Sequence, residues 1–183
     1  MTQLENRLVE AALEAGAAKA AVIRQSQIVL SADFRKICEG NGCGNYGRCW
    51  VCPPFRGDIQ ANMQEIRSFS KGLIYQSIGR IEDSFDIEGM AACAGEHAQL
   101  SQRLGQRLRP LLPGQTLHLS CGGCRLCPRC ACADGQPCRQ PDRALGSLEG
   151  YGVDVYQTVR DTPLKYCNGP DTVTFFGMVL WGE

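Results

Sequence analysis

The chain has no excess charge of either sign, because its 183 residues include 19 Lys and Arg and 19 Asp and Glu. A balanced chain creates no overall field toward a polyanion, so its charge does not indicate a nucleic-acid or membrane partner. It also has no apolar run near the roughly 18 residues that a membrane-spanning helix requires. The first residues, MTQLENRLVEAALEAG, are rich in charged side chains and are not expected to form a secretory signal peptide. We therefore expect a soluble, cytoplasmic protein.

Familiar catalytic motifs are missing as well. No nucleophile–base–acid set, phosphate-binding loop or dinucleotide-binding fingerprint stands out in the sequence. The chain also has no low-complexity segment, and no internal repeat beyond two cysteine-rich stretches. On these grounds we lean against a catalyst with its own substrate.

Cysteine, by contrast, is abundant, and ten of the twelve cysteines fall into two groups. The groups are Cys38, Cys43, Cys49 and Cys52, and then Cys121, Cys124, Cys127, Cys130, Cys132 and Cys138. Thiolates are soft ligands that bind zinc or iron–sulfur clusters. In the reducing cytosol such a pattern indicates metal binding, whereas a disulfide framework would require export. The second group also offers too many neighbouring thiols for one defined pairing.

Apolar periodicity predicts alternating helices and strands. Helices are expected over residues 3–15, from Asp58 onward, over 87–109 and from Ser147 onward; strands are expected over 18–23, 28–30, 72–78, 116–120 and 172–181. This order predicts an α/β fold with helices packed on one sheet, with an α+β ferredoxin-like sandwich as the alternative. We expect a single domain over 1–183, with metal-binding loops at about 38–55 and 121–141.

In the first loop, the pair Cys49-x2-Cys52 is shared by redox motifs and zinc knuckles, so it is weak by itself. The prediction of a metal site is strengthened by Cys38 and Cys43 upstream and by the glycines between these cysteines. Glycine-rich backbone can turn its amides inward to donate hydrogen bonds to sulfur, which tunes an iron–sulfur site. Three aromatic residues of this loop either shield the site from water or belong to the core: Tyr46, Trp50 and Phe55.

In the second loop, the run from Cys121 to Cys130 approaches the bacterial ferredoxin pattern C-x2-C-x2-C-x3-C-P, with the last spacing one residue short. The favoured ligand set is Cys124, Cys127, Cys130 and Cys138, in the form C-x2-C-x2-C-x7-C. Zinc more often uses two separated CxxC knuckles, and three closely stepped cysteines fit it less well. The spacing therefore favours an iron–sulfur cluster over zinc.

Other polar residues have simpler interpretations. His118 lies three residues before Cys121 and is expected to be an ordinary strand histidine rather than a mixed ligand. We expect His97, on the long helix, to be solvated, and Cys93 to be a small buried hydrophobic residue. A basic helix face is expected to be solvated, or alternatively to bind an acidic redox partner: Arg103, Arg107 and Arg109.

The sequence resembles the family known as domain of unknown function 2284, described as predicted metal-binding proteins. The resemblance runs through CGNYGRCWVCPPF, CRLCPRCACADGQPCRQP, SLEGYGVDV and TVTFFGMVL, and so covers most of the chain. It implies a first site with Cys38, Cys43 and Cys52, and a second with Cys124, Cys127, Cys130 and Cys138. If Cys49 is not a ligand, the fourth donor of the first site comes from Cys121, Cys132 or Cys167, and the two loops lie side by side. The family supplies no activity to carry over.

Together these features predict an iron–sulfur protein with two [4Fe–4S] clusters that transfers electrons to a partner protein or serves as a redox accessory to an anaerobic enzyme. The expected ligands are Cys38, Cys43, Cys49, Cys52, Cys124, Cys127, Cys130 and Cys138, with Cys121, Cys132 and Cys167 in reserve. One alternative is a zinc-binding structural or interaction module. Another is an iron–sulfur enzyme that uses an open cluster site or a spare thiol.

Overall fold

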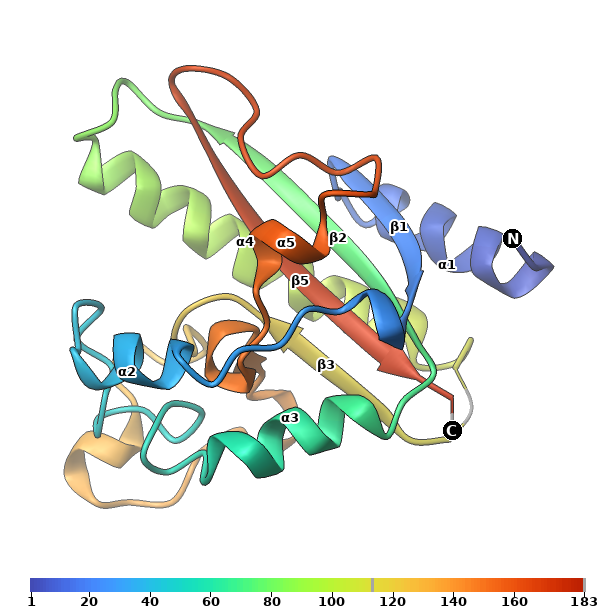
Figure 1. The fold of residues 1–183 in the computed structure, drawn as a ribbon. Coiled ribbons are helices and arrows are strands. Elements are labelled where there is room, and N and C mark those ends of the chain that lie inside the picture. The colour runs from blue at the N-terminus through green and yellow to red at the C-terminus, as the bar shows by residue number, and fades with distance from the viewer. Residues whose placement is uncertain (113, 183) are drawn as a thin grey trace.

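A five-stranded mixed sheet organises the computed structural model, which describes residues 1–112 and 114–182. The strands are β1 (Lys19–Arg24), β2 (Lys71–Arg80), β3 (Thr116–Ser120), β4 (Gly146–Ser147) and β5 (Thr172–Trp181). Their order is β1-β2-β5-β3-β4 (Figure 1). The first three pairings along this order are antiparallel, and β3 pairs with β4 in parallel.

Helices and helical turns connect these strands. The α-helices are α1 (Gln3–Glu14), α2 (Phe34–Glu39), α3 (Ile59–Arg67), α4 (Ile87–Leu108) and α5 (Val155–Thr158). Single 3₁₀ turns are η1 (Gln25–Gln27), η2 (Ala131–Asp134), η3 (Pro141–Arg143) and η4 (Glu149–Tyr151). Among the described residues, no helix is both long enough and apolar enough to cross a membrane.

The centre of the sheet is the antiparallel ladder between β2 and β5, which runs from Lys71 opposite Trp181 to Arg80 opposite Thr172. Successive strand residues point to opposite faces, so adjacent residues enter different cores. Tyr75 belongs to one core and Ile74 to the other. Because both faces are covered, the β5 sequence is almost continuously apolar, as expected for a doubly buried strand.

Helices α1 and α4 cover one face of the sheet. Leu8 and Ala12 of α1 and Leu104 of α4 are fully buried against β2 and β5. Thr2 and Glu5 form a reciprocal capping box at the start of α1, which satisfies two backbone amides. Glu5 also accepts a hydrogen bond of 2.7 Å from Lys71 of β2, which ties the helix to the sheet.

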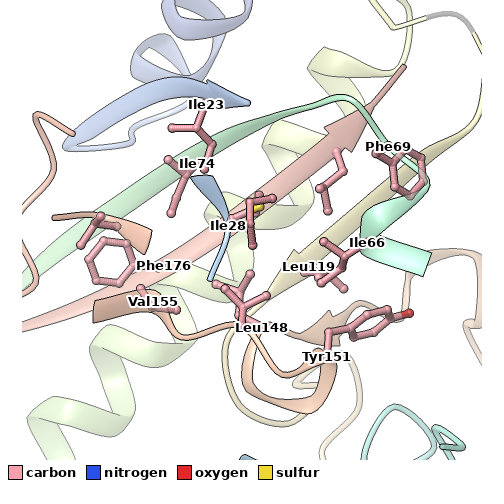
Figure 2. Close-up of a cluster of buried hydrophobic side chains, with 14 of the residues drawn as sticks. Ile23, Ile28, Ile66, Phe69, Ile74, Leu119, Leu148, Tyr151, Val155 and Phe176 are labelled. Atoms are coloured by element: carbon pink, nitrogen blue, oxygen red, sulfur yellow. The ribbon is translucent and has the colours of Figure 1, made fainter. Parts of the chain in front are cut away.

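The opposite face is covered by α3, α5 and the turns around β4. Ile66 of α3, Val155 of α5 and Leu148 form one cluster with Ile74 and Phe176 of the central strands (Figure 2). The side chain of Asp58 accepts hydrogen bonds from the first amides of α3, as a helix cap is expected to do. Helical segments on both faces confirm the predicted α/β arrangement.

Two local predictions need correction. Residues 28–30 were expected to form a strand, but only an isolated bridge between Leu30 and Val153 forms there. The segment from Ser147 is not one helix: β4, η4 and α5 follow in turn, and Gly152 has a φ of 79°, which ends the first turn. The short helix α2, which carries Cys38, was not predicted at all.

A hydrogen-bonded polar network crosses the α4 side of the sheet. The hydroxyl of Tyr75 lies 2.8 Å from Ser101 Oγ and 2.9 Å from His118 Nε2, and Ser101 Oγ lies 3.0 Å from Ser120 Oγ. His97 was expected to be solvated, but it is fully buried, with Nδ1 2.8 Å from Ser77 Oγ. His97 faces the sheet from α4, so the apolar face of that helix is interrupted by an imidazole whose Nε2 is buried without a hydrogen-bond partner among the described residues. The network ends at Ser120, directly before Cys121.

The two histidines should stay neutral in mildly acidic solution. Burial lowers the pKa of both His97 and His118 to about 4, compared with about 6.5 in an unfolded chain. Between these values the unfolded state binds protons that the folded state does not, so stability falls as the pH decreases from about 6.5 toward 4. An NMR titration of the two imidazole rings should give midpoints near pH 4. A midpoint near the unfolded value would contradict the burial of these rings.

Replacing Gly177 with Ala should destabilise the sheet. Gly177 lies opposite Tyr75 in the β2–β5 ladder, and a Cβ at this position would overlap the Tyr75 ring and hydroxyl. Because Tyr75 is fully buried and held by Ser101 and His118, we expect a loss of about 1–3 kcal/mol of unfolding free energy.

Urea unfolding at fixed metal loading, followed by circular dichroism, measures this loss. The matched control is Gly95→Ala on α4, where a new Cβ meets nothing within 4 Å. It should stabilise the helix by about 0.5–1 kcal/mol. Equal stability of the two variants would show that the Tyr75 position is not constrained.

Candidate metal centre

The two cysteine loops lie side by side beyond the carboxyl end of β3 (Figure 1). β3 ends at Ser120 and passes directly into the second loop at Cys121. The first loop starts within α2, which packs on η4, and η4 follows β4, the parallel neighbour of β3. The β3–β4 edge therefore positions both loops, although about seventy residues separate them in the sequence.

Buried cysteines make the contact between the loops. Cys49 and Cys52 are 2% and 8% exposed, and Cys124 and Cys130 of the second loop pack against them. The indole Nε1 of Trp50 donates a 2.9 Å hydrogen bond to the carbonyl of Gln136, across the same boundary. The two loops therefore lie side by side, whichever cysteine is the fourth donor of the first site.

The four cysteines favoured for the second site line one small cavity: Cys124, Cys127, Cys130 and Cys138. Gln140 forms part of this wall, with Nε2 3.7 Å from the sulfur of Cys127 and 3.2 Å from the carbonyl of Leu126. A side-chain amide at this distance donates a weak hydrogen bond to sulfur, as ligand-supporting groups do. η2 and the left-handed Gly135 (φ 65°) return the chain from Cys130 toward Cys138.

The four cysteines of the first loop differ in their exposure to solvent. Cys49 and Cys52 are buried, Cys38 is half-buried in α2, and Cys43 is exposed. A hydrogen bond from the Cys52 thiol lowers the pKa of Cys49, and the same bond raises the pKa of Cys52. Burial, and next the neighbouring Cys43, raise the pKa of Cys38. Negative charge on Cys43 and Cys38 also acts on Cys52, so all four thiols share one electrostatic environment.

The reserve cysteines occupy different surroundings. Cys132 is buried in η2, where Cys130 and Cys49 add to the effect of burial in raising its pKa. Cys121 is half-buried at the end of β3, and Cys167 is exposed between α5 and β5. Cys93, expected to be buried, is half-buried on α4 with its sulfur 3.7 Å from the carbonyl of Arg80.

Glu149 was missed by the sequence interpretation. It begins η4, and its Oε2 atom is buried without a hydrogen-bond partner among the described residues. Burial raises its pKa, and its charge acts on the thiols of both Cys38 and Cys121. The only signal in the sequence was an acidic residue inside the otherwise apolar and glycine-rich stretch SLEGYGVDV.

The donor chemistry fits a thiolate-bound metal. All twelve cysteines are free, and ten of them lie in the two adjoining loops as a possible ligand supply. Within residues 1–112 and 114–182, no group of three or more His, Cys, Asp or Glu side chains is arranged to hold a single metal ion. The proposed ligand sets therefore rest on spacing and on the shared cavity rather than on coordination geometry.

A comparison with protein families gives one match. A family model described as "Predicted metal-binding protein (DUF2284)" matches residues 21–181. The matched region begins inside β1 and ends with β5, so it includes β2 to β5, most of β1 and both cysteine loops. No curated protein and no solved structure matches the chain.

Replacing Trp50 with Phe should loosen the contact between the loops. Phe keeps an aromatic ring near Phe55, whose centroid lies 4.8 Å from that of Trp50, but it cannot donate to Gln136. One lost hydrogen bond of about 1 kcal/mol corresponds to about a fivefold change in rate or affinity. We therefore expect metal to pass to a chelator about five times faster from Trp50→Phe than from the native protein.

The matched control is Tyr46→Phe in the same loop, because no hydrogen bond to the Tyr46 hydroxyl is found among the described residues. Its release rate should equal that of the native protein. If Trp50→Phe also releases metal at the native rate, the cross-loop hydrogen bond does not hold the site together.

Proposed function

This chain belongs to the DUF2284 family of predicted metal-binding proteins, and we propose that it is an iron–sulfur protein with two [4Fe–4S] clusters that acts in electron transfer. The clusters would belong to one domain over residues 1–183, with loops at about 38–55 and 121–141. The observation that carries the proposal is the cavity lined jointly by Cys124, Cys127, Cys130 and Cys138.

The spacing of these four residues supports a cluster. Three cysteines come from a tight run with two residues between neighbours, and the fourth lies seven intervening residues further on. When bound, a [4Fe–4S] cluster supplies one-electron transfer, and its potential depends on hydrogen bonds to sulfur and on solvent exposure. Gln140 offers such a hydrogen bond at Cys127, and the cavity wall of Leu126 and Ala131 excludes water.

The first loop would hold the second cluster through Cys38, Cys43, Cys49 and Cys52. The contact of Cys49 and Cys52 with Cys124 and Cys130 supports two adjacent centres. Exposed Cys43 marks the side from which a redox partner would be reached. The helix face considered earlier for an acidic partner is less suited, because Arg107 pairs with Glu14 at 3.1 Å and Arg103 donates to the carbonyl of Ala15.

A zinc-binding structural module is the second candidate, and one observation favours it. Cys49-x2-Cys52 resembles a zinc knuckle, and in space it packs against Cys124 and Cys130 of the other loop. A zinc ion bound by four thiolates from the two loops would join the loops to each other. Such a module would be colourless and would not transfer electrons.

Anaerobic purification followed by metal and sulfide analysis tests the proposal. We expect a brown protein with broad visible absorption, holding about eight iron and about eight acid-labile sulfide per chain, as two cubanes require. Stoichiometric zinc without sulfide would contradict the iron–sulfur assignment and establish the zinc module instead.

The ligand set can be tested with two cysteine variants. Cys138→Ser should lose about half of the iron, because one cubane loses its distal ligand while the other is retained. The matched control is Cys93→Ser on α4, outside both loops, which should keep the native iron content. Equal iron content in the two variants would remove Cys138 from the ligand set.

A further inference from the structure

A cavity of about 290 Å³ adjoins the start of the second cysteine loop, where Cys121, Gly122 and Arg125 line it. Its polar end is formed by Cys121, Arg125 and Glu149, and its apolar end by Tyr166, Phe175 and Phe176. Binding pockets commonly combine an apolar wall with a few converging polar groups. The size suits a small organic molecule, and the proposed cluster ligands Cys124, Cys127, Cys130 and Cys138 line a different cavity.

The polar end carries groups that the fold does not use. Among the described residues, Arg125 takes part in no ion pair or side-chain hydrogen bond, while Arg129, four residues later, pairs with Asp134 at 2.7 Å. The Oε2 atom of Glu149 is buried and likewise has no partner. A buried polar atom without a partner is costly, so a ligand that hydrogen-bonds to it gains the full value of that contact.

Arg125 supplies the positive charge at this end of the cavity. A guanidinium binds a carboxylate with two parallel hydrogen bonds, so this end of the cavity suits a ligand with a carboxylate group.

The apolar end is built from aromatic rings on β5 and the segment before it. Tyr166 and Phe176 stack with centroids 5.9 Å apart and an interplanar angle of 14°. Tyr166 is 49% exposed, which places it at the mouth, whereas Phe176 is 4% exposed and forms the inner wall. Such walls favour the hydrocarbon part of a ligand over a bare inorganic anion.

We propose that this cavity binds a small organic carboxylate, with its carboxylate group on Arg125 and its hydrocarbon part against Tyr166 and Phe176, next to the Cys121 thiol. The site goes beyond the proposed electron-transfer function and does not depend on which metal the loops hold. It assigns a role to Cys121 that leaves this thiol outside the metal ligands.

Alkylation of the anaerobically purified protein with iodoacetate and with iodoacetamide tests the site. Both reagents transfer a CH2 group to a thiol and release iodide, but only iodoacetate carries a carboxylate. Peptide mass spectrometry gives the rate at each cysteine, and exposed Cys167 serves as the internal reference. The iodoacetate-to-iodoacetamide rate ratio at Cys121 should exceed that at Cys167 about tenfold, the value of one charge-assisted hydrogen bond.

Two variants and a competitor complete the test. Arg125→Gln should reduce the Cys121 ratio to the Cys167 value, while Arg129→Gln, the matched control in the same loop, should leave it unchanged. In the native protein, millimolar phenylacetate should slow the alkylation of Cys121 and phenylacetamide should not, which tests the site even if Arg125→Gln loses its metal.

Equal ratios at Cys121 and Cys167, or equal protection by the acid and the amide, would each overturn the proposal. A failure of the iron–sulfur assignment has a different signature. It would show as missing acid-labile sulfide, with zinc in place of iron or with loop cysteines open to alkylation, and it would not change the comparison between Cys121 and Cys167.

Discussion

The β2–β5 ladder is the interaction on which the rest of the molecule depends. Its ten residue pairs place one apolar core on each face of the sheet, so α1 and α4 must pack on one side and α3 and α5 on the other. β3 pairs with β5 and takes its position from this ladder, and β4 takes its position from β3. The carboxyl end of β3 is therefore a fixed point from which the second cysteine loop departs.

Placing both cysteine loops at that point has a chemical consequence. A long polar loop could not bury thiols by itself, but two loops packed on each other bury Cys49 and Cys52 beside Cys124 and Cys130. The arrangement keeps ten thiols near one edge of a rigid sheet, which is how a protein holds a preorganised ligand supply. Cys121 is the first residue of the second cysteine loop, and together with Glu149 it lines a separate cavity. A metal centre and a small-molecule site would then share one loop, which leaves room for chemistry beyond electron transfer.

Much of the fold could be predicted because its signals are local. β5 was predicted with its observed bounds, since TVTFFGMVLW is rich in β-branched and aromatic residues, and α4 ended as expected before Pro110. α2 was missed because its six residues have no side-chain cap and no buried face. His97 was misjudged because its partner, Ser77, lies on a strand that sequence spacing does not relate to the helix. For the same reason, sequence spacing could group the cysteines within each loop but could not predict that the two loops are in contact; it left this contact as one possibility.

The most direct test of the account is an anomalous diffraction measurement on anaerobically grown crystals, at the iron and zinc absorption edges. The account predicts two iron-edge peaks in the adjoining loops, one of them enclosed by Cys124, Cys127, Cys130 and Cys138, with Cys121 unligated at the neighbouring cavity. A single peak present only at the zinc edge, or an iron peak bound by Cys121, would contradict it.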